Sequence, residues 1–412
     1  MYKRQLLLDA EVDESTGVVN TVNPYLRCIE LANAKKTEVE QEFNRMNNPN
    51  MDWSLQEQIK SNLEIYKRDT DKLDFSDMLS LFAAGEGNAP ELEALIVDEA
   101  QDLTPLQWSV VQRLKQSVRR VYYAGDDDQA IHKWAGVEAS DFINCTPNKI
   151  VLDQSYRVPK LVHELANRLI RRVDERYQKH WNPTDKEGYV GYHSDMWNLD
   201  FGKGSWTIMA RTNGLLVPVM QRLNELGYLY SNSEGKTNIS KNILEAKNIW
   251  ERLCKGNAVY VIELRRLYDQ MPKNSAILKR GAAAFLDTLD PEIPHRLEEL
   301  QQSDKFLATA DMPWFDVIKG VNDGTRQRFD AIARREGTEN MNNPRIKVST
   351  IHRMKGGEDD NIVLMSDTSW GARKYSDLDD ERRVFYTGVT RAKDRLHIIL
   401  PQTKLHFEEL VQ

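Results

Sequence analysis

Short apolar runs that end in clusters of polar residues recur along the chain. Residues 95–97 form the first such run, and Asp98 and Glu99 follow it directly. Continuous apolar runs are typical of strands covered on both faces of a parallel sheet, so we predict a buried strand here. Open α/β sheets bind their ligands at the carboxyl ends of such strands, which makes both carboxylates candidate site residues.

The same pattern predicts further strands, with helices between them. We expect strands at residues 120–125, 149–152, 206–210, 345–351, 362–365 and 396–400. We expect helices at residues 30–46, 55–66, 105–114, 159–169, 213–223 and 380–392. Apolar positions three or four residues apart mark one face of the helices at 105–114 and 159–169. Thr104, Pro105 and Gln107 supply the capping hydroxyl, first-turn proline and N3 amide of a helix start. This alternation of strands and helices predicts the α/β class.

The predicted secondary structure changes between residues 240 and 339. Strand signals fade there, and helical patterns take over at residues 246–255, 261–268 and 325–335. Strand signals then resume at residue 345. We therefore predict an α-helical insertion that interrupts the second domain.

Composition places limits on the class of protein. A chain of 412 residues is long enough for two or three domains. It has no apolar run of membrane-spanning length and no secretory signal, and its three widely spaced cysteines form no CxxC pair, so we expect a cytoplasmic protein with no membrane partner. The net charge of −7 argues against general adhesion to nucleic acid, although a local basic groove remains compatible with it.

The strand-end acids suggest a particular chemistry. One of the two carboxylates, Asp98 or Glu99, can hold Mg²⁺ through water while the other polarises a water that attacks a nucleotide. An Asp-Glu pair after a strand also occurs by chance, so this stretch alone leaves the matter open. Gln129 and Trp134 follow the acidic run of residues 126–128, where a solvated turn is the simpler interpretation of the acids alone.

An aromatic residue lies beside an arginine at the next strand-to-helix junction. Tyr156 and Arg157 suit stacking on a base and contact with a phosphate, but they could equally be a surface pair.

Five motifs, taken together and in order, carry a resemblance. They are VDEAQD (97–102), GDDDQAI (125–131), QSYR (154–157), STIHRMKGGE (349–358) and RRVFYTGVTRA (382–392). In this order the chain resembles the ATPase motor of superfamily 1 DNA helicases of the UvrD/Rep type. The resemblance implies two RecA-like parallel-sheet motor lobes, ATP and Mg²⁺ as cofactors, and single-stranded DNA and duplex junctions as partners.

The resemblance also implies roles for single residues at the nucleotide. Asp98 would hold Mg²⁺, Glu99 would activate water, and Gln129 would sense the γ-phosphate or position the water. Tyr156 would stack on adenine. The other nucleotide contacts implied are the γ-phosphate arginines Arg157 and Arg391 of the second lobe, the ribose contact Glu358, and the neighbouring turn around Gly356.

For DNA, the resemblance implies that Trp134 stacks on a base of the single strand and that Thr350 and His352 contact its backbone. A histidine with its hydrogen bonds satisfied at a domain interface is the alternative for His352. The expected direction of movement, 3′ to 5′, comes from the resemblance alone, and the pathway served, whether DNA repair, replication or recombination, stays open.

The implied domain organisation follows the motifs. We expect residues 1–80 to be the remnant of a helical insert and residues 81–148 the C-terminal part of an incomplete first lobe. Residues 149–239 and 340–412 would form the second lobe, interrupted by the helical insertion 240–339.

The sequence departs from the family in its phosphate loop. No GxxxxGK[ST] pattern occurs in it, and we predict that Gly235, Lys236 and Thr237 form a solvated loop. Ala135 replaces an arginine found in many relatives. We therefore expect a truncated helicase, or one part of a split enzyme that needs a second polypeptide with the phosphate loop and is inactive alone. A non-catalytic single-stranded-DNA-binding or regulatory protein is the alternative, and a metal-dependent nuclease is a weaker third.

Overall fold

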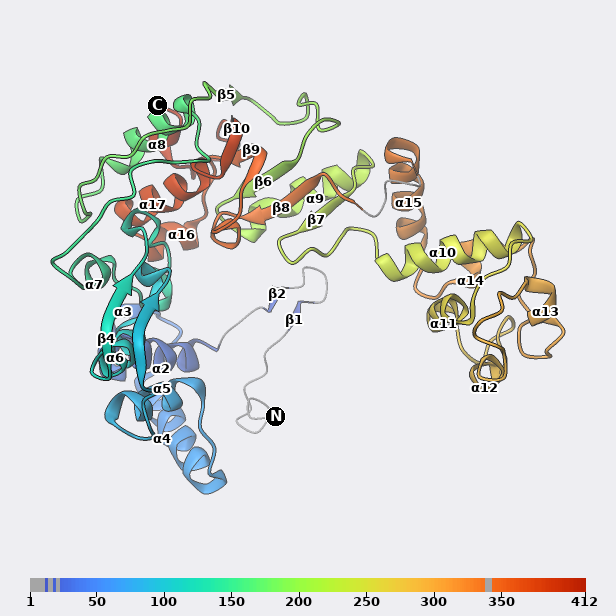
Figure 1. Ribbon diagram of the computed structural model, residues 1–412, viewed down its shortest axis with the longest axis horizontal. Coiled ribbons are helices and arrows are strands. Elements are labelled where there is room, and N and C mark those ends of the chain that lie inside the picture. Colours follow the sequence, from blue (N-terminus) through green and yellow to red (C-terminus); the bar gives the residue numbers. More distant parts are fainter. Residues whose placement is uncertain (1–11, 14–17, 20–22, 338–342) are drawn as a thin grey trace. The chain divides into compact units, whose positions relative to one another are not determined.

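The protein divides into two compact units. The computed structural model describes residues 12–13, 18–19, 23–337 and 343–412 (Figure 1). The first unit comprises Met1–Tyr156, Glu164–Pro183 and Gly371–Thr387, and the second comprises Arg157–His163, Thr184–Trp370 and Gly388–Gln412.

Four helices follow one another in the first unit between residues 24 and 84. They are α2 (Pro24–Lys35), α3 (Val39–Met46), α4 (Trp53–Thr70) and α5 (Phe75–Ala84). Leu26, Ile29 and Leu63 belong to the small core that joins the first three of them. The single helix predicted over residues 30–46 is wrong, because Lys36 adopts a left-handed conformation (φ 56°) that ends α2 before α3 begins.

Two parallel strands carry the first acidic motifs. Strands β3 (Leu92–Val97) and β4 (Val118–Tyr123) pair in register, with Ile96 opposite Tyr122. Helix α6 (Pro105–Lys115) covers one face of this pair through Trp108 and Val111. The capping box predicted at its start is confirmed, since the side chains of Thr104 and Gln107 accept each other's backbone N–H groups.

The other face of this sheet is exposed. Ile96 is 72% exposed and Tyr122 54% exposed, and Leu92 lies on the same face as Ile96. The strand predicted at residues 95–97 is therefore confirmed as part of β3, but the prediction that it is buried is wrong. Among the described residues the sheet has two strands and a helical layer on one face, so every second apolar side chain faces solvent.

Short elements complete the first unit. The short strands β1 (Val12–Asp13) and β2 (Val18–Val19), which pair antiparallel, precede the helices. Helix α8 (Lys160–Ile170) begins in the second unit, and helix α17 (Leu378–Val389) ends in it. The others are the 3-10 turns η1 (Ala100–Asp102), η2 (Asp127–Gln129) and η3 (Lys133–Ala135) and the helices α7 (Ala139–Ile143) and α16 (Trp370–Tyr375).

A six-stranded parallel sheet forms the framework of the second unit. Its order is β5-β10-β9-β6-β8-β7, and every neighbouring pair is parallel. The strands are β5 (Tyr189–His193), β6 (Trp206–Ala210), β7 (Tyr230–Asn232), β8 (Ile346–Thr350), β9 (Asp359–Met365) and β10 (Ala392–Ile399). The apolar runs of β6 and β9 are buried almost throughout, as parallel strands covered on both faces require.

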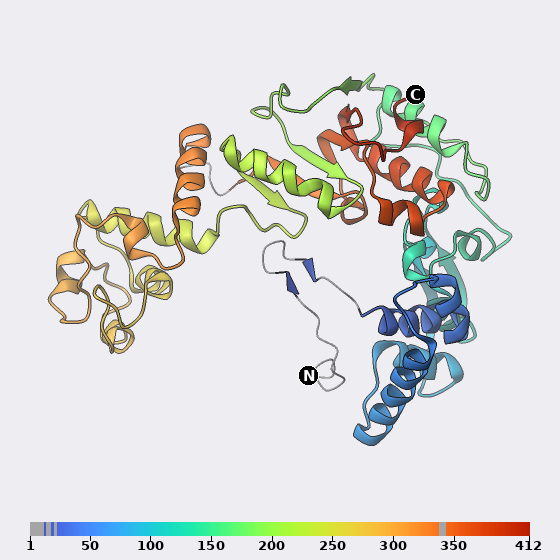
Figure 2. The ribbon, with the colours of Figure 1, turned by 180° about the vertical axis from the view of Figure 1, so that it is seen from behind.

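Helix α9 (Asn213–Glu225) lies across one face of this sheet (Figure 2). Its Leu216, Val219 and Leu223 join a core with Ile208 and Val348 of the strands. The α/β class with parallel sheets predicted from the sequence is confirmed.

Helices occupy the chain between β7 and β8. They are α10 (Lys241–Cys254), α11 (Val261–Gln270), α12 (Ala282–Leu286), α13 (Leu297–Gln301), α14 (Trp314–Val317) and α15 (Asp323–Glu336). Trp250, Leu264 and Phe306 are buried at the centre of their main cluster. The predicted change to helical structure is thus confirmed within the described residues.

Some local predictions differ from the structure. The strand predicted at residues 149–152 is wrong: Ile150 is 92% and Leu152 89% exposed, and no strand pairs with them among the described residues. Strands β5 and β7 were not predicted, because both are short and rich in Tyr and polar residues. Gly235 and Lys236 lie in an exposed turn after β7, as predicted. The 3-10 turns η5 (His352–Met354) and η6 (Glu408–Leu410) complete the second unit, and no helix in the described part of the chain could cross a membrane.

Candidate functional site

The two predicted catalytic carboxylates lie immediately beyond the end of β3. Asp98 and Glu99 are both exposed, and Glu99 N–H donates to Asp98 Oδ1 at 2.9 Å. Glu99 has φ 49° and ψ 38°, a left-handed conformation that is unusual for a residue with a side chain. A strained residue of this kind persists only where the surrounding structure holds it in place. Such residues are concentrated at functional sites.

A buried glutamine connects this strand end to the next. Gln101 is 1% exposed, its Nε2 donates to Glu99 Oε2 at 2.5 Å, and its Oε1 accepts the Asp126 N–H at 3.0 Å. Gly125 leaves room for it, since a Cβ at that position would lie 2.2 Å from Gln101 Oε1. Gln101 therefore fixes the acid pair relative to the turn that follows β4.

Asp126 in turn holds the predicted sensor. Its Oδ2 accepts a hydrogen bond from Gln129 Nε2 at 2.7 Å, and its Oδ1 accepts the Asp128 N–H at 3.2 Å. Burial tends to raise the pKa of Asp126, but Lys179 and the hydrogen bonds outweigh it and hold this pKa below its ordinary value. The structure thus brings Asp98, Glu99 and Gln129 to the carboxyl edge of one sheet.

The remaining two acids of the motif are not a solvated turn. Asp127 and Asp128 are buried and face cations from residues 172–183, a segment that carries none of the five motifs. Arg383 of α17, which is 5% exposed, donates from Nε to the Asp127 carbonyl oxygen at 3.2 Å. The alternative of a solvated acidic turn is therefore wrong for these two residues.

Trp134 lies in the exposed turn η3. It is 51% exposed, with the guanidinium of Arg27 lying 5.8 Å from its ring centre and the His132 ring 6.0 Å away. A solvent-facing indole beside an arginine suits a stacked base with a nearby phosphate. Tyr156, the predicted adenine contact, is 92% exposed at the end of the first unit's long N-terminal segment.

The second unit gathers the other predicted nucleotide contacts. An Arg157 NH1 to Glu358 Oε2 distance of 3.6 Å defines an ion pair, and Lys393 Nζ lies 3.7 Å from Glu358 Oε1. Arg391 is 1% exposed and donates to the carbonyl oxygen of Gly357 at 3.3 Å. Gly356, which precedes Gly357, takes a left-handed conformation (φ 78°), and such a conformation favours glycine.

The two predicted DNA-backbone contacts flank the end of β8. Thr350 is its last residue and is 8% exposed, and its hydroxyl accepts the Arg353 N–H at 3.3 Å. His352 opens the following turn η5 and is half-buried. Both residues precede the Gly356 turn in one short segment.

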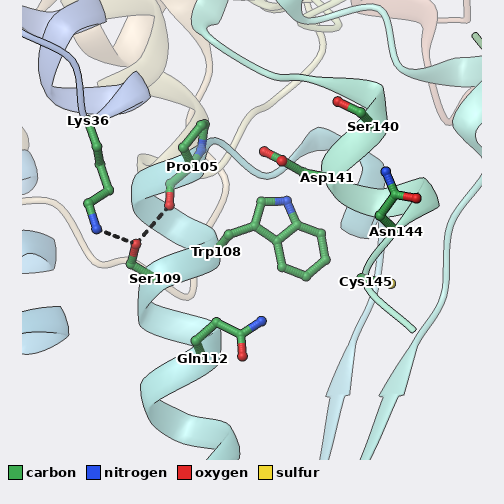
Figure 3. A pocket seen from close by; sticks show the side chains of 9 residues that line it. All are labelled: Lys36, Pro105, Trp108, Ser109, Gln112, Ser140, Asp141, Asn144 and Cys145. Carbon is green, nitrogen blue, oxygen red and sulfur yellow. Dashed lines mark hydrogen bonds between the residues drawn. The ribbon is translucent and has the colours of Figure 1, made fainter. Parts of the chain in front are cut away.

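A polar cavity of about 560 Å³ lies in the first unit, between α6 and α7 (Figure 3). Trp108 forms its wall, and the Lys36 ammonium donates to Ser109 Oγ at its rim at 2.9 Å. None of the predicted site residues lines it. Asp141, also in its lining, has its pKa raised by burial.

Sequence patterns missed the residues that connect the site. Gln101 belongs to the VDEAQD motif, so its position beside the acids was a usable signal. Arg176 and Lys179 had no such signal, because they lie about fifty residues beyond the acids that they contact.

Two family models match the chain. The UvrD/REP helicase N-terminal domain matches residues 6–149, and the UvrD-like helicase C-terminal domain matches residues 322–403. The ATP-dependent DNA helicase PcrA of Bacillus subtilis is 25% identical over 213 residues, and that of Leuconostoc citreum is 26% identical over 219. The chain belongs to the UvrD-type superfamily 1 helicases.

The matches to these relatives are partial. They span 48% and 50% of this chain but 27% and 28% of the two PcrA proteins. Among solved structures, the arterivirus nonstructural protein 10 helicase, alone and with DNA, aligns with 78% and 77% of the chain at a TM-score of 0.32, with 11% and 12% identity. Family membership and the parallel sheets together support RecA-like motor lobes.

Proposed function

We propose that this chain provides most of the catalytic side chains of an ATP-dependent DNA helicase or translocase that moves 3′ to 5′ on single-stranded DNA. The observation that carries the proposal is the hydrogen-bonded path from Glu99 through Gln101 and Asp126 to Gln129. A carboxylate and an amide held at one sheet edge suit a reaction that depends on positioning a water and neutralising phosphate charge.

Each proposed role has a physical basis. Glu99 orients the attacking water and takes its proton, while Gln129 positions the water against the γ-phosphate. Arg157 and Arg391 offset the negative charge that develops on the transferred phosphoryl group. Tyr156 stacks on adenine and Glu358 accepts a hydrogen bond from the ribose.

Asp98 fits Mg²⁺. It presents an exposed carboxylate, of which Oδ1 accepts a backbone N–H. Mg²⁺ keeps several waters and needs only one or two protein carboxylates beside the nucleotide phosphates, so a single exposed acid is sufficient. When bound, the ion would neutralise phosphate charge.

For DNA, we propose that a base stacks on Trp134 and that Thr350 and His352 contact the backbone. Successive closing and opening of the motor would then pass bases across Trp134. We further propose the division into an incomplete first lobe (81–148), a second lobe (149–239 and 340–412) and a helical insertion (240–339).

We also propose that a polypeptide segment with a GxxxxGK[ST] phosphate loop, on the same chain or a separate one, completes the first lobe. The exposed face of β3 and β4 supports this, because Ile96 and Tyr122 are large apolar side chains on a parallel sheet, which proteins normally cover on both faces. A two-stranded sheet is also marginal by itself.

DNA-stimulated ATP hydrolysis tests the proposal. We expect little turnover from the 412-residue polypeptide, and turnover once a segment with the phosphate loop is supplied. Glu99→Gln should then abolish turnover while leaving nucleotide binding intact, whereas Glu93→Gln, an exposed acid on the same strand, should change neither. Retained turnover in Glu99→Gln would remove Glu99 from the base role.

The alternative is a single-stranded-DNA-binding or regulatory protein without catalysis. Exposed Trp134 beside Arg27 favours DNA binding whether or not ATP is hydrolysed. DNA binding in the completed protein without any hydrolysis would select this alternative.

A further inference from the structure

A lysine outside the five motifs contacts all three acids of the GDDDQ motif. Lys179 Nζ lies 2.7 Å from Asp126 Oδ1 and 3.1 Å from Asp128 Oδ2, and it also forms an ion pair with Asp127. Its side chain is 14% exposed. These contacts are largely shielded from solvent, so they are much stronger than surface ion pairs.

An arginine three residues earlier anchors the same turn. Arg176 donates from Nε and NH2 to the two oxygens of Asp128, at 2.8 and 2.6 Å. Their side chains are 3% and 0% exposed, respectively. The intervening Tyr177 N–H donates to Asp127 Oδ2 at 2.8 Å. A bidentate arginine pair of this kind fixes both position and orientation.

The carboxylate of Asp126 connects Lys179 to the proposed sensor, Gln129. One of its oxygens faces Lys179, and the other accepts the amide of Gln129 at 2.7 Å. With both oxygens engaged, the carboxylate is held in one orientation, and this orientation sets where it accepts the Gln129 amide. The half-buried Gln129 side chain therefore depends on a cation about fifty residues away in sequence.

We propose that Lys179 is a positioning residue for ATP hydrolysis, acting through Asp126 on Gln129, and that Arg176 anchors the turn in which these two residues lie. This rests on the proposed function, in which Gln129 places the attacking water. A misplacement of the order of 1 Å in such a group can slow the chemical step about a hundredfold.

Charge explains why a lysine is required there. Asp126, Asp127 and Asp128 bring three carboxylates together, and Arg176 offsets one of them. Without Lys179, the turn would retain an unbalanced pair of partly buried acids, which repel each other and favour proton uptake. The turn would then open or protonate, and either change releases Gln129.

The decisive experiment is a double-mutant cycle on DNA-stimulated ATP hydrolysis by the completed protein. Lys179→Met should lower kcat about 10-fold to 100-fold and leave the KM for ATP within about threefold. In a Gln129→Ala background the same change should have less than about a twofold effect, because the positioned group is gone. Effects that multiply fully would overturn the proposal.

Matched variants separate positioning from general stability. Lys179→Arg retains a cation and should recover part of kcat. Lys203→Met, at a lysine that is 90% exposed, should behave as wild type. Lys179→Met with Asp127→Asn restores the charge balance, so we expect its thermal stability to return while kcat stays low. Recovery of kcat together with stability would reduce Lys179 to a structural residue.

A second readout does not depend on catalysis. Hydrogen exchange of the backbone amides of residues 126–130 should speed up at least tenfold in Lys179→Met, measured on the 412-residue chain. Absence of ATP hydrolysis in the wild-type completed protein would refute the proposed function, but it would not refute the effect of Lys179 on the turn. Unchanged hydrogen exchange in this turn in Lys179→Met would refute the positioning role of Lys179.

Discussion

Gly125→Ala should uncouple the two strand ends. A Cβ at this position would lie 2.2 Å from Gln101 Oε1 and 3.0 Å from Phe142 Cζ. Carbon and oxygen do not approach to 2.2 Å without bonding, so the Gln101 amide must turn away. It would then lose its hydrogen bonds to Glu99 and to the Asp126 N–H. Gly125 does not have the left-handed φ that disfavours alanine, so the effect is steric.

The magnitude follows from the Asp126 amide that loses its acceptor. A buried N–H without a partner costs about 1–3 kcal/mol, so urea titration should show that loss in the free energy of unfolding. Hydrogen exchange of Asp126 should accelerate, and DNA-stimulated hydrolysis by the completed protein should fall. Gly214→Ala is the control, since nothing lies within 4 Å of its Cβ and its helix position should tolerate or favour alanine. If Gly125→Ala matches wild type in stability and exchange, the bridging role of Gln101 is wrong.

Three further outcomes are expected. Trp134→Ala should weaken single-stranded DNA binding by about 1–3 kcal/mol in fluorescence titrations. The dependence of the binding affinity on salt concentration should change little, since stacking releases few counterions. An unchanged affinity would make Trp134 a structural residue. Burial and the neighbouring His193 lower the pKa of His397 to about 4, below its ordinary value of 6.5, so the unfolded chain takes up the proton first as pH falls. The contribution of His397 to the free energy of unfolding is thus present above pH 6.5 and lost toward pH 4. Urea titrations should show a loss of about 2 kcal/mol between pH 7 and pH 5. His397→Phe should remove this difference. Thr104→Ala should lower stability by about 1 kcal/mol through loss of the α6 cap, and an equal urea midpoint would contradict that.

The predictable part of the site is local in sequence. Asp98 and Glu99 follow a strand, Gln129 follows the next strand, and parallel pairing brings such ends together whatever the rest of the chain does. The start of α6 was predictable for the same reason, because a capping box involves residues three apart. The residues expected to contact nucleotide and DNA in the second unit were identified by resemblance to motifs, and their roles remain proposals.

The unpredictable part depends on long-range contacts. The apolar run at residues 149–152 predicted a strand, but no neighbouring strand pairs with it among the described residues. Burial of Ile96 was expected from its neighbours in sequence, yet burial depends on which layer covers each face of the sheet. Hydrophobicity indicates which residues favour burial, and only packing decides which of them are covered.

The sequence by itself determined the α/β class, the helical character of residues 241–336 and the placement of acids at strand ends, because periodicity and strand-to-turn order are local properties of a chain. The tertiary structure decided that Gln101 joins the two acidic turns and that Arg176 and Lys179 hold the buried carboxylates of Asp127 and Asp128 and the half-buried one of Asp126. The pairing of charges about fifty residues apart arises from the path of the chain, and no local pattern in the sequence records it.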